Sequence, residues 1–259
     1  MSLRYSTGCR DKMLKFKSFR QVFEDSKIYI YTGAQPATAD AAATGSLIVT
    51  LTKASGTVTS KSTRQISITK ITTRGSDGDK HIMTIDGVAY EYTVVTADTV
   101  ATIAANLAAL IDANEYVEAV QGGGANITEE VIIMRSRFAG ATAFVAVASN
   151  TGSAVTATVE DFVATAAGNG LRFGNPSSAV ISKSADVWSG VVSLAGTNTA
   201  GWFRMVEYGG NPASISTTEA RVDGSIGVGL GDGQVGNTSM EYAATITLAT
   251  AAFTFPYAE

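Results

Sequence analysis

Apolar and polar residues alternate along much of the chain. Two runs near the N-terminus, residues 27–33 (KIYIYTG) and 46–52 (SLIVTLT), show the period of two that is typical of a β-strand. Pro36 lies between them and cannot donate to a sheet, so that segment is predicted to be a connection or an edge segment. Similar short runs separated by glycine, proline and asparagine occupy residues 179–194, 201–209, 219–228 and 244–255. Together they predict a mainly β fold, a sandwich or a barrel.

Residues 7–26 follow a helical period instead. Apolar side chains recur at spacings of three, three and four residues, with lysines largely between them: Met13, Phe16, Phe19 and Phe23. This pattern predicts one amphipathic helix with a basic face. Two interpretations stay open: the helix packs on the core of its own domain, or its apolar stripe docks on a neighbouring subunit as an assembly element.

The middle of the chain changes character. Residues 80–95 form two alternating runs around Asp86-Gly87, which predicts a hairpin with a type I′ turn. Residues 98–114 carry apolar side chains at helical spacing behind Asp98, the expected N-cap. Strands are expected at 116–121, 130–136, 144–149 and 154–162. The order of these elements predicts a small, self-contained α+β unit.

The sequence pattern divides the chain into three segments and predicts two domains. The β runs before the α+β unit are too few to form a domain, so residues 1–65 and 168–259 are expected to build one β body. Residues 66–167 would then be an inserted α+β domain, because loop tips tolerate such insertions.

Composition and charge narrow the classes of function. The chain of 259 residues is 45% hydrophobic and 16% charged, which suggests that much of its surface faces other protein. A net charge of −4 gives no strong field toward nucleic acid or an anionic membrane. The basic N-terminal segment lacks the apolar run of roughly 7–15 residues of a secretory signal. No window reaches the roughly 18 apolar residues of a membrane span, so a soluble, unexported protein is expected.

Few residues offer chemistry. Cys9 and His81 are the only residues of their kinds, so a nucleophile–histidine site could use only His81, and Cys/His zinc sites are excluded by count. We expect His81 to be structural. Gly231, Gly233 and Gly236 match G-x-G-x-x-G, but a strand pattern follows where a dinucleotide site needs a helix. These glycines are therefore predicted to form a turn.

Acidic and aromatic residues leave two alternatives. Asp77 and Asp79 supply too few oxygens for an EF-hand loop and are predicted to shape a turn. Adjacent acids could in principle form a glycosidase dyad, although surface acids are the favoured interpretation: Glu129 with Glu130, and Glu160 with Asp161. Trp188 and Trp202, with Tyr208, could form a sugar platform, or the tryptophans could anchor a β core. We predict no catalytic residues, no cofactor and no metal.

Several phrases resemble a family of bacteriophage virion structural proteins encoded among head and tail genes. They are residues 4–14 (RYSTGCRDKML), 28–52, 184–205 (SADVWSGVVSLAGTNTAGWFRM) and 221–227 (RVDGSIG). Residues 83–113 are similar to a small module that recurs in phage tail and appendage proteins. The family pattern joins the two β halves by a short loop, and the insertion departs from it.

The resemblance implies a virion component without catalytic residues, made in the host cytoplasm. Its partners would be copies of itself, in a homo-oligomer, and other virion proteins. Its place on the particle would be capsid decoration, the neck or collar, or the tail. The alternative is a virion-surface receptor- or glycan-binding module with the insert as its binding domain.

Cys9 departs from the apolar residue that the resemblance implies at this position. One interpretation is a small buried hydrophobe. The other is an intermolecular disulfide, since Arg10 and Lys12 provide positive charge that favours the thiolate.

Overall fold

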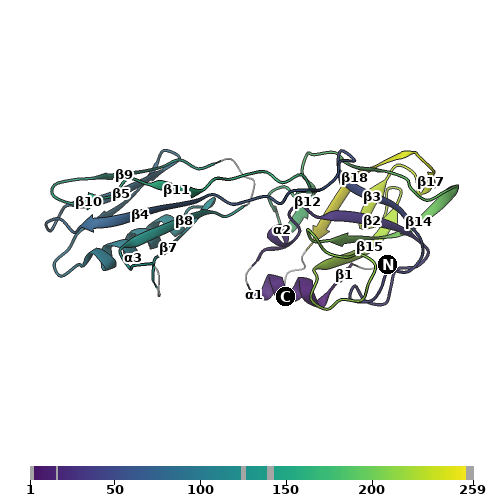
Figure 1. Cartoon of the computed structure of the whole chain (residues 1–259), viewed down its shortest axis with the longest axis horizontal. Helices are drawn as coiled ribbons and strands as arrows, with labels where there is room; N and C mark the ends of the chain where they lie inside the picture. Colours follow the sequence, from purple (N-terminus) through teal and green to yellow (C-terminus); the bar gives the residue numbers. More distant parts are fainter. Residues whose placement is uncertain (1–2, 16, 124–126, 139–142, 255–259) are drawn as a thin grey trace. The chain divides into compact units, whose positions relative to one another are not determined.

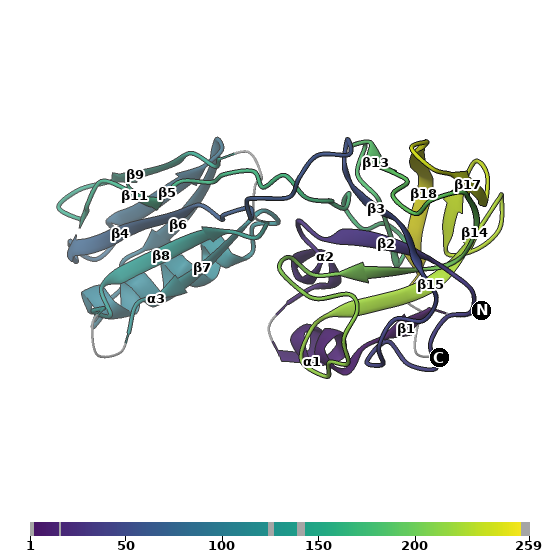
Figure 2. The same ribbon diagram turned by 45° about the vertical axis from the view of Figure 1, so that its right-hand side comes forward.

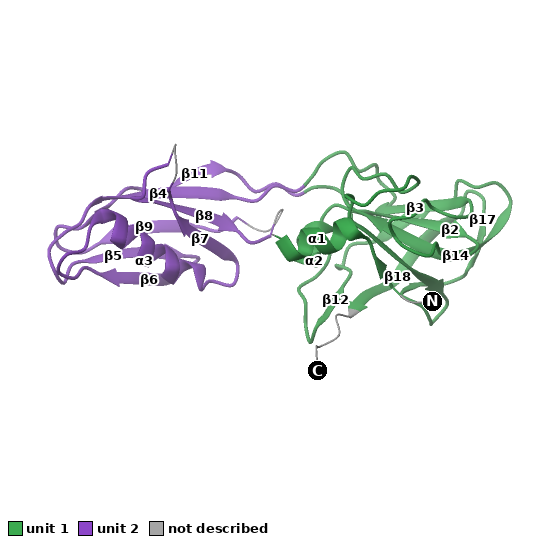
Figure 3. Cartoon of the chain, turned by 90° about the horizontal axis from the view of Figure 1, so that it is seen from below, with its two compact units in different colours: residues 1–61, 168–259 green, residues 62–167 purple. Residues whose placement is uncertain are grey.

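The computed structural model describes residues 3–15, 17–123, 127–138 and 143–254 (Figure 1). It is mainly β, as predicted, with 42% of residues in strands and 11% in helices. The chain divides into two compact units, coloured separately in Figure 3. Residues 1–61 and 168–259 form the first, which we call the barrel unit, and residues 62–167 form the inserted unit.

The boundaries of the two units differ slightly from those expected. The inserted unit begins at residue 62 rather than 66, because residues 62–65 already contact it. The backbone N–H of Thr63 donates to Ala166 O at 2.9 Å, and the Gln65 amide donates to Phe144 O at 2.9 Å. Each unit has a separate hydrophobic core.

A closed β-barrel of seven strands forms the body of the barrel unit. Around the barrel, each strand pairs with the next and the last pairs with the first. In this order the strands are β15 (Arg221–Gly227), β16 (Gly233–Val235), β18 (Thr245–Thr254), β13 (Trp188–Val191), β3 (Leu47–Lys53), β2 (Lys27–Thr32) and β14 (Thr197–Val206). Three short strands extend it: β1 (Arg4–Tyr5) on β15, β12 (Val180–Ser182) on β18 and β17 (Ser239–Glu241) on β14.

The period-two pattern places one set of side chains inside the barrel. Ile28 and Ile30 of β2 lie opposite Leu51 and Val49 of β3, and all four side chains are buried. Because successive residues of a strand point to opposite faces, the polar neighbours face outward. The segment with Pro36, residues 33–46, is a connection between β2 and β3, as predicted.

The second half of strand β14, Trp202 to Val206, is buried on both faces. Phe203 and Met205 belong to the barrel core, while Trp202 and Arg204 alternate with them and are also inaccessible to solvent. The guanidinium of Arg204 donates to Ala41 O at 3.0 Å and to Pro212 O at 2.8 Å. It therefore fixes two connections against the outside of the barrel.

Two short helices replace the single helix expected over residues 7–26: α1 (Thr7–Lys15) and α2 (Phe19–Val22). Ser18 starts the second helix with a capping box. Its hydroxyl accepts from the Gln21 N–H at 3.3 Å, and the Gln21 side chain accepts from the Ser18 N–H at 3.0 Å. These two bonds favour a new helix start at Ser18, so the one-helix prediction is wrong.

The aromatic stripe of this segment packs inside the barrel unit. Phe19 and Phe23 are buried with ring centroids 4.8 Å apart, and Phe19 lies 5.1 Å from Phe253. Met13 is partly buried against the same core, and Phe16 lies outside the described residues. An exposed docking stripe is therefore wrong for Phe19 and Phe23, which serve the core of their own unit.

The described residues of the inserted unit form two sheets and one helix. The larger sheet has the order β10 (Val155–Thr156), β4 (Ile66–Thr73), β8 (Val131–Ser136) and β7 (Val117–Gln121), with β11 (Glu160–Val163) also paired to β4. The smaller sheet has the order β6 (Val88–Thr93), β5 (Lys80–Ile85) and β9 (Ala146–Asn150). Helix α3 (Val100–Asp112) lies along the larger sheet and also contacts β5 and β6 (Figure 2).

The hairpin and the helix of the inserted unit lie where the sequence predicts them. Asp86 and Gly87 both have positive φ, at 48° and 86°, as a type I′ turn requires. The helix cap differs, because Thr99 rather than Asp98 accepts the N–H of Thr102. Asp98 instead accepts the Val95 N–H at 2.9 Å and the Tyr92 hydroxyl at 3.0 Å.

Deleting residues 62–167 and joining the flanks with a short Gly/Ser link is expected to leave a folded barrel. The two flanks meet within the barrel unit, where Asn169 accepts the N–H groups of Thr59 and Ser60 at 3.0 and 3.1 Å. Circular dichroism and the fluorescence of Trp188 and Trp202 would report a cooperative unfolding transition. A random-coil spectrum would contradict the division into two units.

Candidate functional site

The larger sheet of the inserted unit has two apolar faces. On one face, Ile71, Ile132 and Met134 are buried in the unit's core, which also includes residues of α3. Ile66, Ile68, Val131 and Ile133 alternate with buried neighbours along β4 and β8, so they point to the other face. They are only partly buried there and form the floor of a groove.

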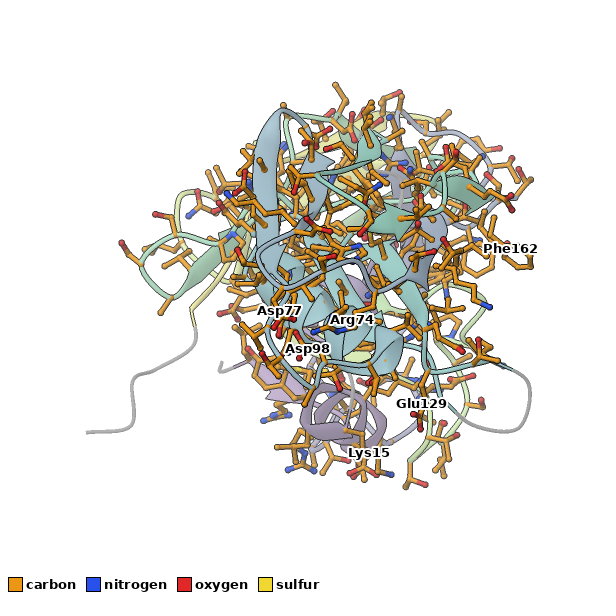
Figure 4. The ribbon with its side chains drawn as sticks, turned by 90° about the vertical axis from the view of Figure 1, so that its left-hand side faces the viewer. Lys15, Arg74, Asp77, Asp98, Glu129 and Phe162 are labelled. Atoms are coloured by element: carbon orange, nitrogen blue, oxygen red, sulfur yellow. The ribbon has the colours of Figure 1, made fainter. Side chains whose placement is uncertain are left out.

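Two further apolar side chains project beside this floor. Phe162 of β11 is 75% exposed, and Ile127 in the connection before β8 is 42% exposed. With Thr128 and Arg135 they complete the lining of the groove, whose volume is about 490 Å³. That volume lies within the range of roughly 300–1,000 Å³ found for ligand sites. Figure 4 shows Phe162 and Glu129 at the outer surface of this unit.

Arg135 gives the groove one available positive charge. Its neighbour across the strands, Glu118, pairs instead with Arg64 at 3.1 Å. Within the parts of the chain that the structure describes, the guanidinium of Arg135 has no ion pair and no side-chain hydrogen bond. Because a guanidinium prefers a carboxylate partner, the groove is suited to an apolar group that lies beside an anion.

The sequence contains a signal for this face that the period-two interpretation missed. Strand β8 is apolar at four successive positions, Val131 to Met134, rather than at alternate ones. Continuous apolar runs are typical of strands that are covered on both faces. In the described part of the inserted unit, α3 covers one face of the larger sheet, and the side chains on the other face are only partly buried.

Cys9 is completely buried, which overturns the disulfide interpretation. Burial raises the pKa of its thiol from 9.0 to about 12, Glu207 adds to the rise, and Arg10 and Lys12 oppose it less strongly. The interpretation of Cys9 as a small buried hydrophobe is confirmed, and the alternative from nearby charge is wrong because burial by residues distant in sequence outweighs that charge. Cys9 instead packs in the barrel core, with its Sγ 3.8 Å from the Met13 sulfur.

The native protein is expected to resist alkylation at neutral pH, because the thiolate is the reactive form and the buried thiol keeps its proton. Iodoacetamide labelling of Cys9, followed by mass spectrometry, would show modification only after unfolding. The pKa of the Cys9 thiol is higher in the folded protein than in the unfolded chain, so the free energy of unfolding depends on pH. The stabilising contribution is complete below pH 9 and is lost as the pH rises toward about 12. Rapid labelling of the folded protein at pH 7 would contradict this account.

His81 is a buried structural residue of β5, as predicted. Its Nδ1 lies 2.8 Å from the Thr156 hydroxyl, and its Nε2 lies 3.0 Å from the carbonyl oxygen of Arg74. Both ring nitrogens therefore join β5 to neighbouring segments of the inserted unit. No three His, Cys, Asp or Glu side chains in the described ranges are grouped so that they could hold a metal ion.

Asp77 and Asp79 shape a turn, as predicted. Hydrogen bonds from Thr96 and then from Arg74 lower the pKa of Asp77, and Arg74 and Asp77 point toward each other in Figure 4. Backbone N–H groups of Ser76 and Ser153 lower the pKa of Asp79. These bonds hold the loop before β5 against the loop after β9.

The adjacent acids do not show the arrangement of a glycosidase dyad. Asp161 accepts hydrogen bonds from the Gln65 amide at 3.1 Å and from the hydroxyl of Ser67, so it is engaged in structure. Glu160 and Glu129 are exposed at the surface. Hydrogen bonding to Thr128 lowers the pKa of Glu130, which is the opposite of the shift that a general acid needs.

The tryptophans and the glycine motif are also structural. Trp188 and Trp202 are fully buried, and Trp202 stacks on Tyr31 with centroids 4.7 Å apart, so the sugar-platform interpretation is wrong. Tyr208 is partly exposed and donates to Thr59 O at 3.3 Å. The motif at residues 231–236 begins with a bend at Gly231 and Asp232, but Gly233 to Val235 form strand β16, so the turn prediction holds only for the start of the motif. None of the helices in the described ranges has the length and hydropathy to span a membrane.

Comparison with known proteins assigns the chain to no family. No protein-family model matches the chain, and no curated protein matches its sequence. The function therefore has to be inferred from the chain's own residues.

Proposed function

We propose that this protein is a structural component of a bacteriophage particle, assembling in multiple copies on the capsid, neck or tail through protein–protein contacts. The groove on the inserted unit is the observation that carries the proposal. It exposes Phe162 and Ile127 around a floor of aliphatic side chains, with the charge of Arg135 beside them. An exposed apolar surface of this kind, rimmed by polar residues, is typical of an interaction site.

The barrel unit supports the same role. Because the barrel is closed, its seven main strands have no unpaired edge. The barrel unit is therefore a rigid body that does not add a strand from another chain at these positions. The ion pair of Arg204 with Asp223 and the buried aromatic cluster of Phe19 rigidify it further. The resemblance of residues 4–14, 28–52 and 184–205 to virion structural proteins supplies the phage context.

We do not put forward the receptor- or glycan-binding alternative. That alternative places the binding surface on the inserted unit, and the separate candidate for a sugar platform, Trp188 and Trp202, lies in the interior of the barrel unit. The groove lining contains few polar side chains, whereas sugar recognition depends on many hydrogen bonds. A glycan array that gave a specific, reproducible hit would revive that alternative.

An electron cryo-microscopy map of purified particles tests the proposal. We expect density that fits both the barrel unit and the inserted unit, repeated according to the symmetry of the capsid, neck or tail. Particles that contain no copy of this protein, although it accumulates in the infected cell, would show that the proposal is wrong.

A further inference from the structure

The groove on the inserted unit is suited to an occupant with an apolar group next to an anion. Its floor and sides are apolar, and Arg135 is the one cation among the described residues that line it. A charged partner group at Arg135 would gain a short, charge-assisted hydrogen bond. An apolar side chain would gain most by covering Phe162, because that ring has the largest exposed fraction of the apolar residues that line the groove.

The barrel unit presents one such group at its surface. Among its exposed large apolar side chains in the described ranges, Tyr242 is the only aromatic one and is 62% exposed. Glu241 precedes it, is also exposed, and forms no ion pair or side-chain hydrogen bond with the described residues. By contrast, Leu14 is followed by a lysine, and Leu230 has glycine on both sides.

The turn that carries Glu241 and Tyr242 is held by backbone hydrogen bonds. The N–H of Tyr242 donates to Gly196 O at 3.0 Å, and the N–H of Ala244 donates back to Glu241 O at 3.1 Å. The N–H of Ala243 donates to Val192 O at 3.0 Å. The turn between β17 and β18 is therefore pre-organised, which reduces the entropy lost when it binds.

We infer that the groove binds this turn from a second copy of the chain. This inference rests on the proposed assembly function and specifies the contact through which the copies assemble. The Tyr242 ring covers the groove beside Phe162 and Ile127, and the Glu241 carboxylate accepts from the Arg135 guanidinium. The two surfaces are different, so the contact is heterologous, and repeating it generates a ring or an open array. Tyrosine and arginine are also the residue types that dominate interface energies.

Charge reversal tests the inference in the full-length protein. Sedimentation velocity should show that Arg135→Glu and Glu241→Arg each weaken self-association at least about tenfold, since each places like charges together. Mixing the two single variants should restore association. The glutamate at position 135 of one variant then meets the arginine at position 241 of the other, and the second contact between them has the wild-type residues at both positions. The double variant should likewise associate to within roughly threefold of the wild type.

Tyr242→Ala should weaken association by about tenfold or more, whereas Leu230→Ala, a control at a more exposed apolar side chain of the same unit, should change it less than about twofold. Circular dichroism verifies that each variant is folded. A wild-type chain that stays monomeric, or single variants that associate like the wild type, would overturn the inference. Restoration in the double variant but not in the mixture would assign the contact to a single chain and also overturn it.

The two proposals fail in different ways. If the protein is present in particles but the charge variants assemble normally, the contact is wrong and the proposed function stands. If the variants show the expected association and the protein is absent from particles, the contact stands and the proposed function is wrong.

Discussion

Replacing Arg204 with methionine is expected to lower the free energy of unfolding of the barrel unit by about 3–5 kcal/mol. Arg204 and Asp223 are both inaccessible to solvent, and Nε and Nη2 of Arg204 donate to the two Asp223 carboxylate oxygens at 2.7 Å each. Burial raises the pKa of Asp223, and the bonds from Arg204 oppose that rise. Without the guanidinium, the buried carboxylate of Asp223 loses its partner, and the carbonyl oxygens of Ala41 and Pro212 lose a donor.

Urea unfolding followed by tryptophan fluorescence measures this change, because both tryptophans are buried in the barrel unit. Lys53→Met is the matched control: its ion pair with Asp186, at 3.2 Å, is partly exposed, so the loss should be below about 1 kcal/mol. Adding Asp223→Leu to Arg204→Met should recover part of the stability, since an apolar pair leaves no unpaired charge. An Arg204→Met variant as stable as the control would contradict this account.

Replacing Phe19 with alanine is expected to cost about 3–5 kcal/mol of barrel stability, the usual range for truncating a buried phenylalanine. Its ring lies 5.1 Å from Phe253, 5.5 Å from Phe173 and 6.3 Å from Tyr5, so truncation leaves a cavity where helix α2 meets the barrel core. The same denaturant titration measures the loss.

Leu14→Ala provides the control from the same N-terminal segment. Leu14 is 86% exposed, so its truncation should change stability by no more than about 0.5 kcal/mol. Equal effects of the two substitutions would show that Phe19 does not belong to the core. Reduced assembly with full stability in the Phe19 variant would instead restore the docking interpretation of the aromatic stripe.

Features that depend on neighbours in sequence were predictable. The turn at Asp86-Gly87 needs two residues that tolerate positive φ, and the period of residues 98–114 predicts helix α3, because both signals are local. The break between α1 and α2 was also accessible, since Ser18 and Gln21 have the spacing of a capping box. The apolar period across this break concealed it.

Features that depend on distant residues were not predictable. The positive neighbours of Cys9 indicate a reactive thiol, and only the fold reveals that its burial has the larger effect on the pKa. The pairing of Arg204 with Asp223 requires the register of β14 on β15, where the two residues lie opposite each other. The groove depends on which face of β4 and β8 receives α3, and a continuous apolar run does not specify that face.

Hydroxyl-radical footprinting of Phe162 and Tyr242 tests whether the groove is an assembly contact. It compares the isolated protein below its association range with purified particles. Both rings are exposed in the single chain and should be oxidised readily there. We expect both rings to become protected together in particles, while Leu230, 79% exposed and outside the proposed contact, keeps its reactivity. Equal oxidation of Phe162 and Tyr242 in the two samples would show that the groove is not an assembly contact.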